Sequence, residues 1–374
     1  MTINNLSCDG ITGIMDAWYN QLCNSLNLSI NNFQLCQPII IQANNDNLWA
    51  YINLVPPKTL KYNYWYYNQP AFFSQYAAIV NQLQFPESSF EKDIGKATFA
   101  KWNSYLKGLP QPPPENTLPS VWFQWAIMNA PSVANIGRTD LACMVLIKSA
   151  WAALAPYQGT NAKSPDFLPL FSDLTASLQA SPSVNFSFDS MNANPDVSNS
   201  WVPGNDPNFF GLWTGCWCGL LVNKKFAQSA ISISVKFEHF SVVPVTPGSW
   251  YNSALLHHAL ASKSSPPWDS NTAWDKYFGI DGTLNYAIGS VLAVDGISLS
   301  LTADADFASE EQSVIKSQVE MGYWPIYCPQ KLPVITNDVS FEPGKMTINC
   351  HTDPGSPILM GNNIFKIGQY LGTS

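Results

Sequence analysis

The chain has 374 residues, of which 46% are hydrophobic, 13% aromatic and only 12% charged, with a formal net charge of −8. This composition excludes intrinsic disorder, because disordered chains have few aromatic residues and many charges. The acidic balance and the absence of a basic cluster argue against nucleic acid as a partner, because binding to phosphates requires several Lys or Arg on one face. A weakly charged, amide-rich surface has little repulsion between copies, so we expect a homo-oligomer to be a candidate state.

No targeting or membrane-spanning segment is predicted. The N-terminus lacks the basic and apolar regions of a signal peptide, which favours a cytoplasmic protein, or one exported without a recognisable signal peptide. The apolar stretch 207–223 is shorter than the ~20 residues of a membrane span. Pro119 and Pro131 interrupt the longer uncharged stretch 116–137. We therefore expect a soluble chain with no integral membrane segment.

Residues 1–180 carry mainly helical periodicity. Apolar residues recur at helical spacing in 12–28, 120–128 and 167–178, and Pro70 is typical of a first helical turn. A capping box formed by Ser88 and Glu91 predicts a helix that ends at Gly108. The stretch 38–54 is the exception, because it has the pattern of a small hairpin around a polar Asn-rich turn.

One helix stands out in this half. It is predicted to begin at Thr139 and to run through 139–156, and it is apolar on nearly every face. Such a helix is typically buried, so we expect it at the centre of the N-terminal half. Lys148 is its one charge after Asp140. Lys148 either extends its amine to the surface or is a buried amine able to do chemistry.

Residues 181–374 change to the alternating pattern of strands. The stretch 230–243 alternates apolar and polar residues, and so does the stretch after Asp295-Gly296. The Asp-Gly pair is typical of a tight type I′ turn and predicts a hairpin there. On the second run the predicted faces are Ile297, Leu299 and Leu301 against Ser298, Ser300 and Thr302.

The sequence therefore predicts an α+β fold, with a helical N-terminal half packed on a mainly antiparallel β-sheet or sandwich in the C-terminal half. The predicted regions are 1–180, mainly helical, and 181–374, mainly β. The change in pattern lies near residue 181, and we expect one continuous core rather than two independent domains.

Common catalytic signatures are absent: the sequence contains no Gly-rich nucleotide-binding motif, no zinc-protease motif and no nucleophile-elbow motif. Acid–base chemistry would have to use the few histidines with nearby carboxyl or amine groups. The eight cysteines form no C-x-x-C pair, which favours free buried thiols. No metal site and no cofactor are predicted. The candidate catalytic residues are His239, His257, His258, His351, Glu238 and Lys148.

Aromatic residues supply the candidate binding groups. The run 61–67 is dense in rings, and the loop 268–278 contains two tryptophans. Such rings stack on sugars or flat ligands, although packing inside the protein is the more common role. The candidate ligand-binding residues are Tyr62, Tyr64, Trp65, Trp268 and Trp274.

These features favour a non-enzymatic binding or self-assembling protein that recognises carbohydrate or protein through aromatic side chains. An alternative is an enzyme with a His/carboxylate acid–base site between the helical and β halves. A second alternative is a membrane-active toxin that inserts the apolar stretch 207–223. The sequence leaves the choice between these three classes open.

Overall fold

We describe the protein from a computed structural model, which describes residues 9–40, 44–56, 70–84, 89–192, 225–226, 228–263, 267–268, 271–319 and 335–373. The helices are α1 (Asp9–Ser25), α2 (Asn45–Ile52), α4 (Phe72–Val80), α5 (Ser89–Ile94), α6 (Lys96–Lys107), α7 (Leu118–Asn129), α8 (Ala134–Leu154), α9 (Phe171–Ala180), α11 (Ser253–Ala261), α12 (Asp275–Phe278), α13 (Ser309–Val319) and α14 (Ile367–Tyr370). The strands are β1 (Phe33–Ile40), β2 (Phe167–Leu168), β3 (Val184–Asp189), β4 (Ile231–Pro244), β5 (Thr246–Pro247), β6 (Tyr286–Ala303), β7 (Ile335–Glu342), β8 (Lys345–Thr352) and β9 (Ile358–Lys366).

The chain divides into two compact units, each built from separate segments. Unit 1 comprises Met1–Ala71, Phe167–Thr246 and Tyr286–Tyr370, and holds the large sheet. Unit 2 comprises Phe72–Asp166, Pro247–Asn285 and Leu371–Ser374, and is helical. Most helices precede residue 181 and most strands follow it, so the predicted α+β class is confirmed. The prediction of one continuous core stays a prediction.

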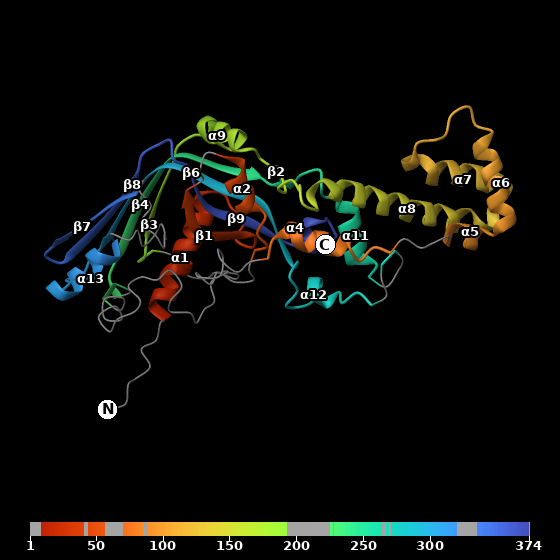
Figure 1. Cartoon of the computed structure of the whole chain (residues 1–374). Coiled ribbons are helices and arrows are strands. Elements are labelled where there is room, and N and C mark those ends of the chain that lie inside the picture. Colours follow the sequence, from red (N-terminus) through yellow and green to blue (C-terminus); the bar gives the residue numbers. More distant parts are fainter. Residues whose placement is uncertain are drawn as a thin grey trace. The chain divides into compact units, whose positions relative to one another are not determined.

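The seven-stranded sheet of unit 1 is antiparallel throughout (Figure 1). Its main path runs β1-β9-β6-β4-β3, and β8 pairs with both β6 and β7. The longest pairing joins β4 to β6, from Ile231 opposite Ala303 to Pro244 opposite Ser290. The alternation predicted for both strands is confirmed. In 231–237 and 297–303 the apolar positions are buried, and the polar positions between them are exposed or half-buried.

The predicted hairpin at Asp295-Gly296 is wrong, because β6 continues through this pair as a single strand. Gly296 does have the positive φ of +65° that an Asp-Gly turn requires. Here the positive φ of Gly296 lies where β6 changes its neighbouring strand along one of its edges. Before the pair β6 hydrogen-bonds to β9, and after it to β8, while β4 stays paired along the other edge. The dipeptide therefore has the backbone that a turn requires, but pairing with β4, β8 and β9 keeps β6 a single strand.

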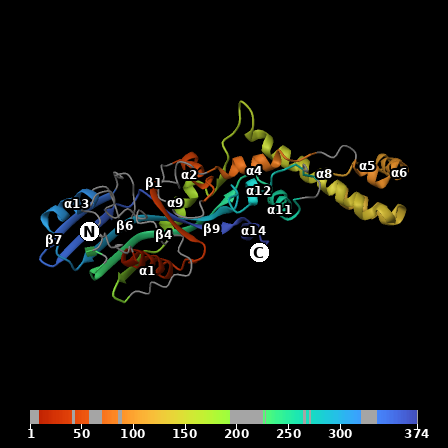
Figure 2. The ribbon, with the colours of Figure 1, turned by 90° about the horizontal axis from the view of Figure 1, so that it is seen from below.

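One face of the β3–β4–β6–β8–β7 part of the sheet is apolar and covered. On α1, the ring of Trp18 packs against Phe186 and Phe188 on β3, with centroids 5.9 and 5.7 Å apart. On α13, Lys316 lies over the ring of Phe341 on β7. Figure 2 shows α1 near β3 and α13 beside β7. On the opposite face of these strands, the described side chains that point outward are exposed or half-buried.

One buried cluster of unit 2 is built from aromatic residues of α5, α6 and α7, and α8 packs against it. The indole of Trp122 is fully buried, and its Nε1 donates to the carbonyl of Ala134 at 2.9 Å. Gly137 on α8 allows this approach, because a Cβ there would lie 2.5 Å from the Trp122 ring. The buried cluster comprises Phe90, Ile94, Trp102, Trp122, Trp125, Ala126, Ala134 and Leu141.

The prediction that α8 is buried on every face is wrong. Ile136 is 45% exposed and Trp151 is 40% exposed. The helix also begins at Ala134 rather than at Thr139, whose hydroxyl donates to the carbonyl of Asn135 inside the helix. Apolar composition alone therefore overestimates burial here, because the exposed side of α8 carries large apolar residues such as Ile136 and Trp151 as well as Ala142 and Ala152.

Two further local predictions are corrected. The second half of the predicted 38–54 hairpin is helix α2, because Asn44 caps it by accepting the backbone N–H of Asn47 at 2.9 Å. The helix expected to end at Gly108 does end there, but it is split into α5 and α6 by Gly95, whose φ is +80°. The first strand of that predicted hairpin is real and is β1, which pairs with β9.

Candidate functional site

The uncovered face of unit 1 is a regular array of polar side chains. The registers of β3, β4, β6, β8 and β7 align these residues into three rows, each crossing all five strands. All of them are exposed or half-buried. The rows are Asn185-Lys236-Ser298-His351-Thr336, Ser187-Ser234-Ser300-Asn349-Asp338 and Asp189-Ser232-Thr302-Thr347-Ser340. We call this surface the polar face.

The polar face follows directly from strand geometry. Side chains alternate between the two faces of a strand, so one buried apolar set forces the intervening set outward. The outward set consists of hydroxyls and carboxamides, except for Asp189, Lys236, His351 and Asp338. An open groove of about 660 Å³ lies over its centre, within the size range of ligand sites. Its lining includes Asn185, Ser187, Ser234, Lys236, Ser298, Ser300, Asn349 and His351.

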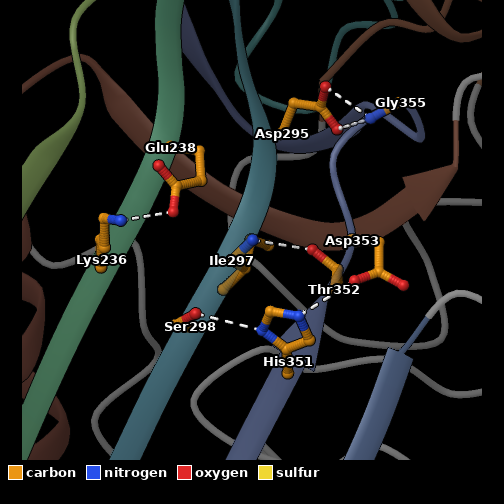
Figure 3. A network of polar contacts seen from close by, with 9 residues as sticks. All are labelled: Lys236, Glu238, Asp295, Ile297, Ser298, His351, Thr352, Asp353 and Gly355. Carbon is orange, nitrogen blue, oxygen red and sulfur yellow. Dashed lines mark hydrogen bonds and ion pairs between the residues drawn. The ribbon is translucent and has the colours of Figure 1, made fainter.

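Side-chain contacts link the first row of the polar face to the end of β8 (Figure 3). The Oγ of Ser298 lies 3.1 Å from Nδ1 of His351. The other ring nitrogen, Nε2, lies 3.1 Å from Oδ1 of Asp353. On β4, Lys236 forms an ion pair with Glu238, two residues along the same face. The row therefore contains a hydroxyl, an imidazole and both signs of charge.

The two contacts of His351 define its tautomer when the ring is neutral. An ionised carboxylate only accepts hydrogen bonds, so Nε2 must hold the proton that is donated to Asp353. Nδ1 then has a free lone pair and accepts the hydroxyl proton of Ser298. Both partners are accessible, since the side chains of His351 and Asp353 are 56% and 94% exposed.

A buried carboxylate holds the chain segment that presents Asp353. The side chain of Asp295 on β6 accepts the backbone N–H groups of Gly355, at 3.0 and 2.9 Å, and of Ser356, at 3.1 Å. Thr352 adds a contact by accepting the backbone N–H of Ile297 at 2.8 Å. Figure 3 shows both contacts at the corner between β8 and β9. Residues 353–357 therefore form a corner between β8 and β9, and Asp295 is the residue that secures it.

His239 belongs to the opposite face of the sheet from His351. Its position on β4 alternates with Lys236 and Glu238, and it shares the parity of the buried Phe237. Its Nδ1 lies 3.2 Å from the carbonyl oxygen of Ser181. The sheet thus separates His239 from the row that contains Glu238 and His351.

The remaining described candidates lie in unit 2. Nδ1 of His258 accepts from the indole N–H of Trp268 at 2.9 Å, and the buried Trp268 ring packs edge-on against Trp274 at 5.1 Å. Burial, followed by the adjacent His257, lowers the pKa of His258. Lys148 is exposed and pairs with Glu115, so its amine reaches the surface. These residues form local packing contacts of the helical unit.

Some predicted residues cannot be placed. Tyr62, Tyr64 and Trp65 lie outside the described residues, as does the stretch 207–223. Within the described ranges, no group of three or more His, Cys, Asp or Glu is arranged to hold a metal ion. Cys23 and Cys143 are free thiols. Burial raises the pKa of Cys23 to about 12, so this thiol is inert at neutral pH.

Sequence reasoning missed most of the polar face. It identified the Ser and Thr side of single strands but assigned them no role. The signal was present, because hydroxyl residues occupy every outward position of 298–302 and two successive ones in 232–234. What the sequence lacks is the register that brings Asn185, Asn349 and Asp338 alongside them.

No family model, curated protein or solved structure matches the chain. In the described part of the chain, the stretch Pro131–Tyr157 is long and apolar enough to cross a membrane by length and composition alone. This stretch includes α8, which packs against α7 and α5 in unit 2. Function is therefore inferred from the geometry of the chain itself.

Proposed function

We propose that the chain is a binding protein that recognises a carbohydrate on the polar face of unit 1. The observation that supports this most is the alignment of hydroxyl and carboxamide side chains into three rows across five strands. A sheet face that served only solubility would favour long charged side chains such as Lys and Glu. Here the outward positions are mainly Ser, Thr and Asn.

The chemistry of these side chains suits a neutral, polyhydroxylated ligand. Each hydroxyl both donates and accepts, and each carboxamide offers both functions at fixed positions. Short side chains lose little conformational entropy when they are immobilised, so more of each hydrogen bond is retained as affinity. Charged partners are less well matched, because Lys236 is balanced by Glu238 and the face also carries Asp189 and Asp338.

The shape of the face favours an extended ligand. Outward side chains repeat about every 6.6–6.8 Å along a strand and about every 4.7–4.9 Å between strands. The groove over the centre is open along the surface and is lined from β3 to β8. A polymer with repeating hydroxyl groups can contact several rows at once, whereas a small molecule would contact few. Recognition through aromatic rings stays a separate proposal.

The test is a glycan array followed by calorimetric titration of the best ligand. Ser234 is exposed near the middle of the polar face, so Ser234→Arg places a long charged side chain across the groove. We expect at least a tenfold loss of affinity, about 1.4 kcal/mol. Ser172→Arg, on the exposed side of α9, is the matched control and should bind like the wild type. Equal binding by both variants, or a blank array, would overturn the proposal.

A second copy of the chain is the competing occupant of this face. Analytical ultracentrifugation of the wild type and of Ser234→Arg measures their oligomeric states and distinguishes a second copy from a carbohydrate as the occupant. If the wild type is an oligomer and the variant a monomer, the polar face is a self-association surface instead. If both sediment alike and only glycan binding is lost, the carbohydrate proposal stands.

A further inference from the structure

We propose that Ser298 is a nucleophile for acyl transfer, with His351 as its general base and Asp353 as the residue that positions the base. The substrate class is an O-acyl ester attached to the carbohydrate of the polar face, so the inference rests on the proposed function. It adds a chemical activity to a surface that otherwise only binds.

The geometry supplies the hydrogen-bond chain that such chemistry needs. An activated serine requires a base within hydrogen-bond reach, and the base requires a third group that orients it. Ser298 Oγ to His351 Nδ1 is 3.1 Å, and His351 Nε2 to Asp353 Oδ1 is 3.1 Å. Because Nε2 of the neutral ring keeps its proton and donates it in a hydrogen bond to Asp353, Nδ1 is left as the acceptor that faces the nucleophile.

The fold places two of these groups on paired strands and the third in the corner that follows β8. Ser298 and His351 are directly opposite each other in the β6–β8 ladder. Asp353 follows two residues after His351 in the corner that Asp295 holds through Gly355 and Ser356. A constellation on paired strands is held more precisely than one on free loops.

A cation lies on the other side of Ser298. Lys236 is its direct partner in the β4–β6 ladder and points to the same face. Lys236 and His351 therefore flank Ser298 in one row, and all three line the groove. Lys236 also pairs with Glu238, so it offsets the negative charge of that carboxylate on the side of Ser298 where an oxyanion would develop during acyl transfer.

The chemical steps balance without a cofactor. The Oγ of Ser298 forms a bond to the acyl carbon, and its proton passes to Nδ1 of His351. The ester C–O bond then breaks, and the leaving alcohol takes that proton. Water hydrolyses the acyl-enzyme in the second half, which regenerates Ser298 and releases the carboxylic acid. Both reacting side chains are open to the groove, so an ester on a ligand bound there reaches them directly.

The test uses diisopropyl fluorophosphate with the full chain. In this reaction the Oγ of serine bonds to phosphorus and fluoride leaves. We expect a single adduct by mass spectrometry, on the peptide that contains Ser298. Ser298→Ala and His351→Ala should abolish it, and added imidazole should restore labelling of His351→Ala. Ser313→Ala, an exposed serine on α13 bonded to the carbonyl of Ser309, should label like the wild type. Absence of labelling, or an adduct on another residue, would overturn the inference.

The role of Asp353 is tested by turnover of p-nitrophenyl acetate. A positioning role predicts that Asp353→Asn lowers kcat at least tenfold and leaves KM unchanged. A change in KM alone would contradict that role. Glycan titration of Ser298→Ala separates the inference from the proposed function. If the wild type binds glycan but is not labelled, the proposal of a nucleophile fails and the carbohydrate proposal stands. If the wild type is labelled but binds no glycan, the carbohydrate proposal fails.

Discussion

A single glycine in unit 2 shows how one residue determines a close contact. Gly137→Ala would place a Cβ 2.5 Å from the buried Trp122 ring, where no flexible chain end can move aside. We expect the free energy of unfolding to fall by about 1–3 kcal/mol, the usual cost of overpacking. Denaturant titration measures this change.

The control for that substitution is Gly108→Ala at the end of α6. Its φ is −82° and the added Cβ would have only ordinary contacts, the nearest at 3.4 Å. We expect a change within about 0.5 kcal/mol, as for most surface substitutions. Equal effects at the two positions would show that Trp122 does not pack as described.

Asp295 is the residue that stabilises the corner between β8 and β9, beside the polar face. Asp295→Ala removes the acceptor of the Gly355 and Ser356 backbone N–H groups, and with it three hydrogen bonds to an ionised side chain. We expect a loss of about 2–3 kcal/mol of unfolding free energy, since charged hydrogen bonds are involved. Asp353→Ala is the control in the same corner, because its side chain is 94% exposed. The account fails here if both variants are equally stable.

His258 gives unit 2 a predictable response to pH. Its pKa is lowered in the folded state, first by burial and then by His257, so the unfolded chain binds a proton more readily. The contribution of His258 to stability is therefore complete at high pH. It is lost as the pH falls below the unfolded value of about 6.5. Melting curves should show a larger decrease in Tm from pH 7 to pH 5 for wild type than for His258→Asn. A parallel decrease in both would contradict this assignment.

Strand β6 shows at the scale of an element how the sheet exchanges partners. Gly296→Ala would strain a backbone with φ of +65° and place a Cβ 2.7 Å from Cγ of Glu238. Gly344 has a similar φ of +76° with open space around it, so Gly344→Ala isolates the backbone cost. We expect Gly296→Ala to be less stable than Gly344→Ala by about 1–3 kcal/mol, because only the former also overpacks. Equal unfolding free energies would contradict the contact with Glu238.

The elements differ in how far the sequence could predict them. The faces of β4 and β6 were predictable, because burial of Ile231 or Leu301 depends on a local period of two. The role of Asp295-Gly296 was not predictable, because the same dipeptide is compatible with a tight turn and with a strand that changes its neighbouring strand. The start of α8 was missed because Thr139 can cap a helix or lie inside one. The contact of Ser298 with His351 depends on a register across 53 residues, which no local pattern contains.

At the scale of the whole molecule, the chain assigns different chemistry to its two units. Unit 2 buries indole rings among its helices, and Trp268 and Trp274 contribute to its local packing. Unit 1 leaves a broad face of hydroxyl and carboxamide groups open to solvent. The candidate catalytic residues predicted from the sequence lie partly in unit 1 and partly in unit 2. Each unit is built from separate segments of the chain, and distance along the sequence does not indicate which segments belong together. The account therefore places recognition on unit 1.

The most direct test of this account is a crystal structure of the full chain with the glycan that binds best on the array. The account predicts ligand density over the polar face, with hydrogen bonds to Ser234, Ser300 and Asn349. Density confined to the aromatic cluster at Trp268 and Trp274, with the polar face empty, would contradict it.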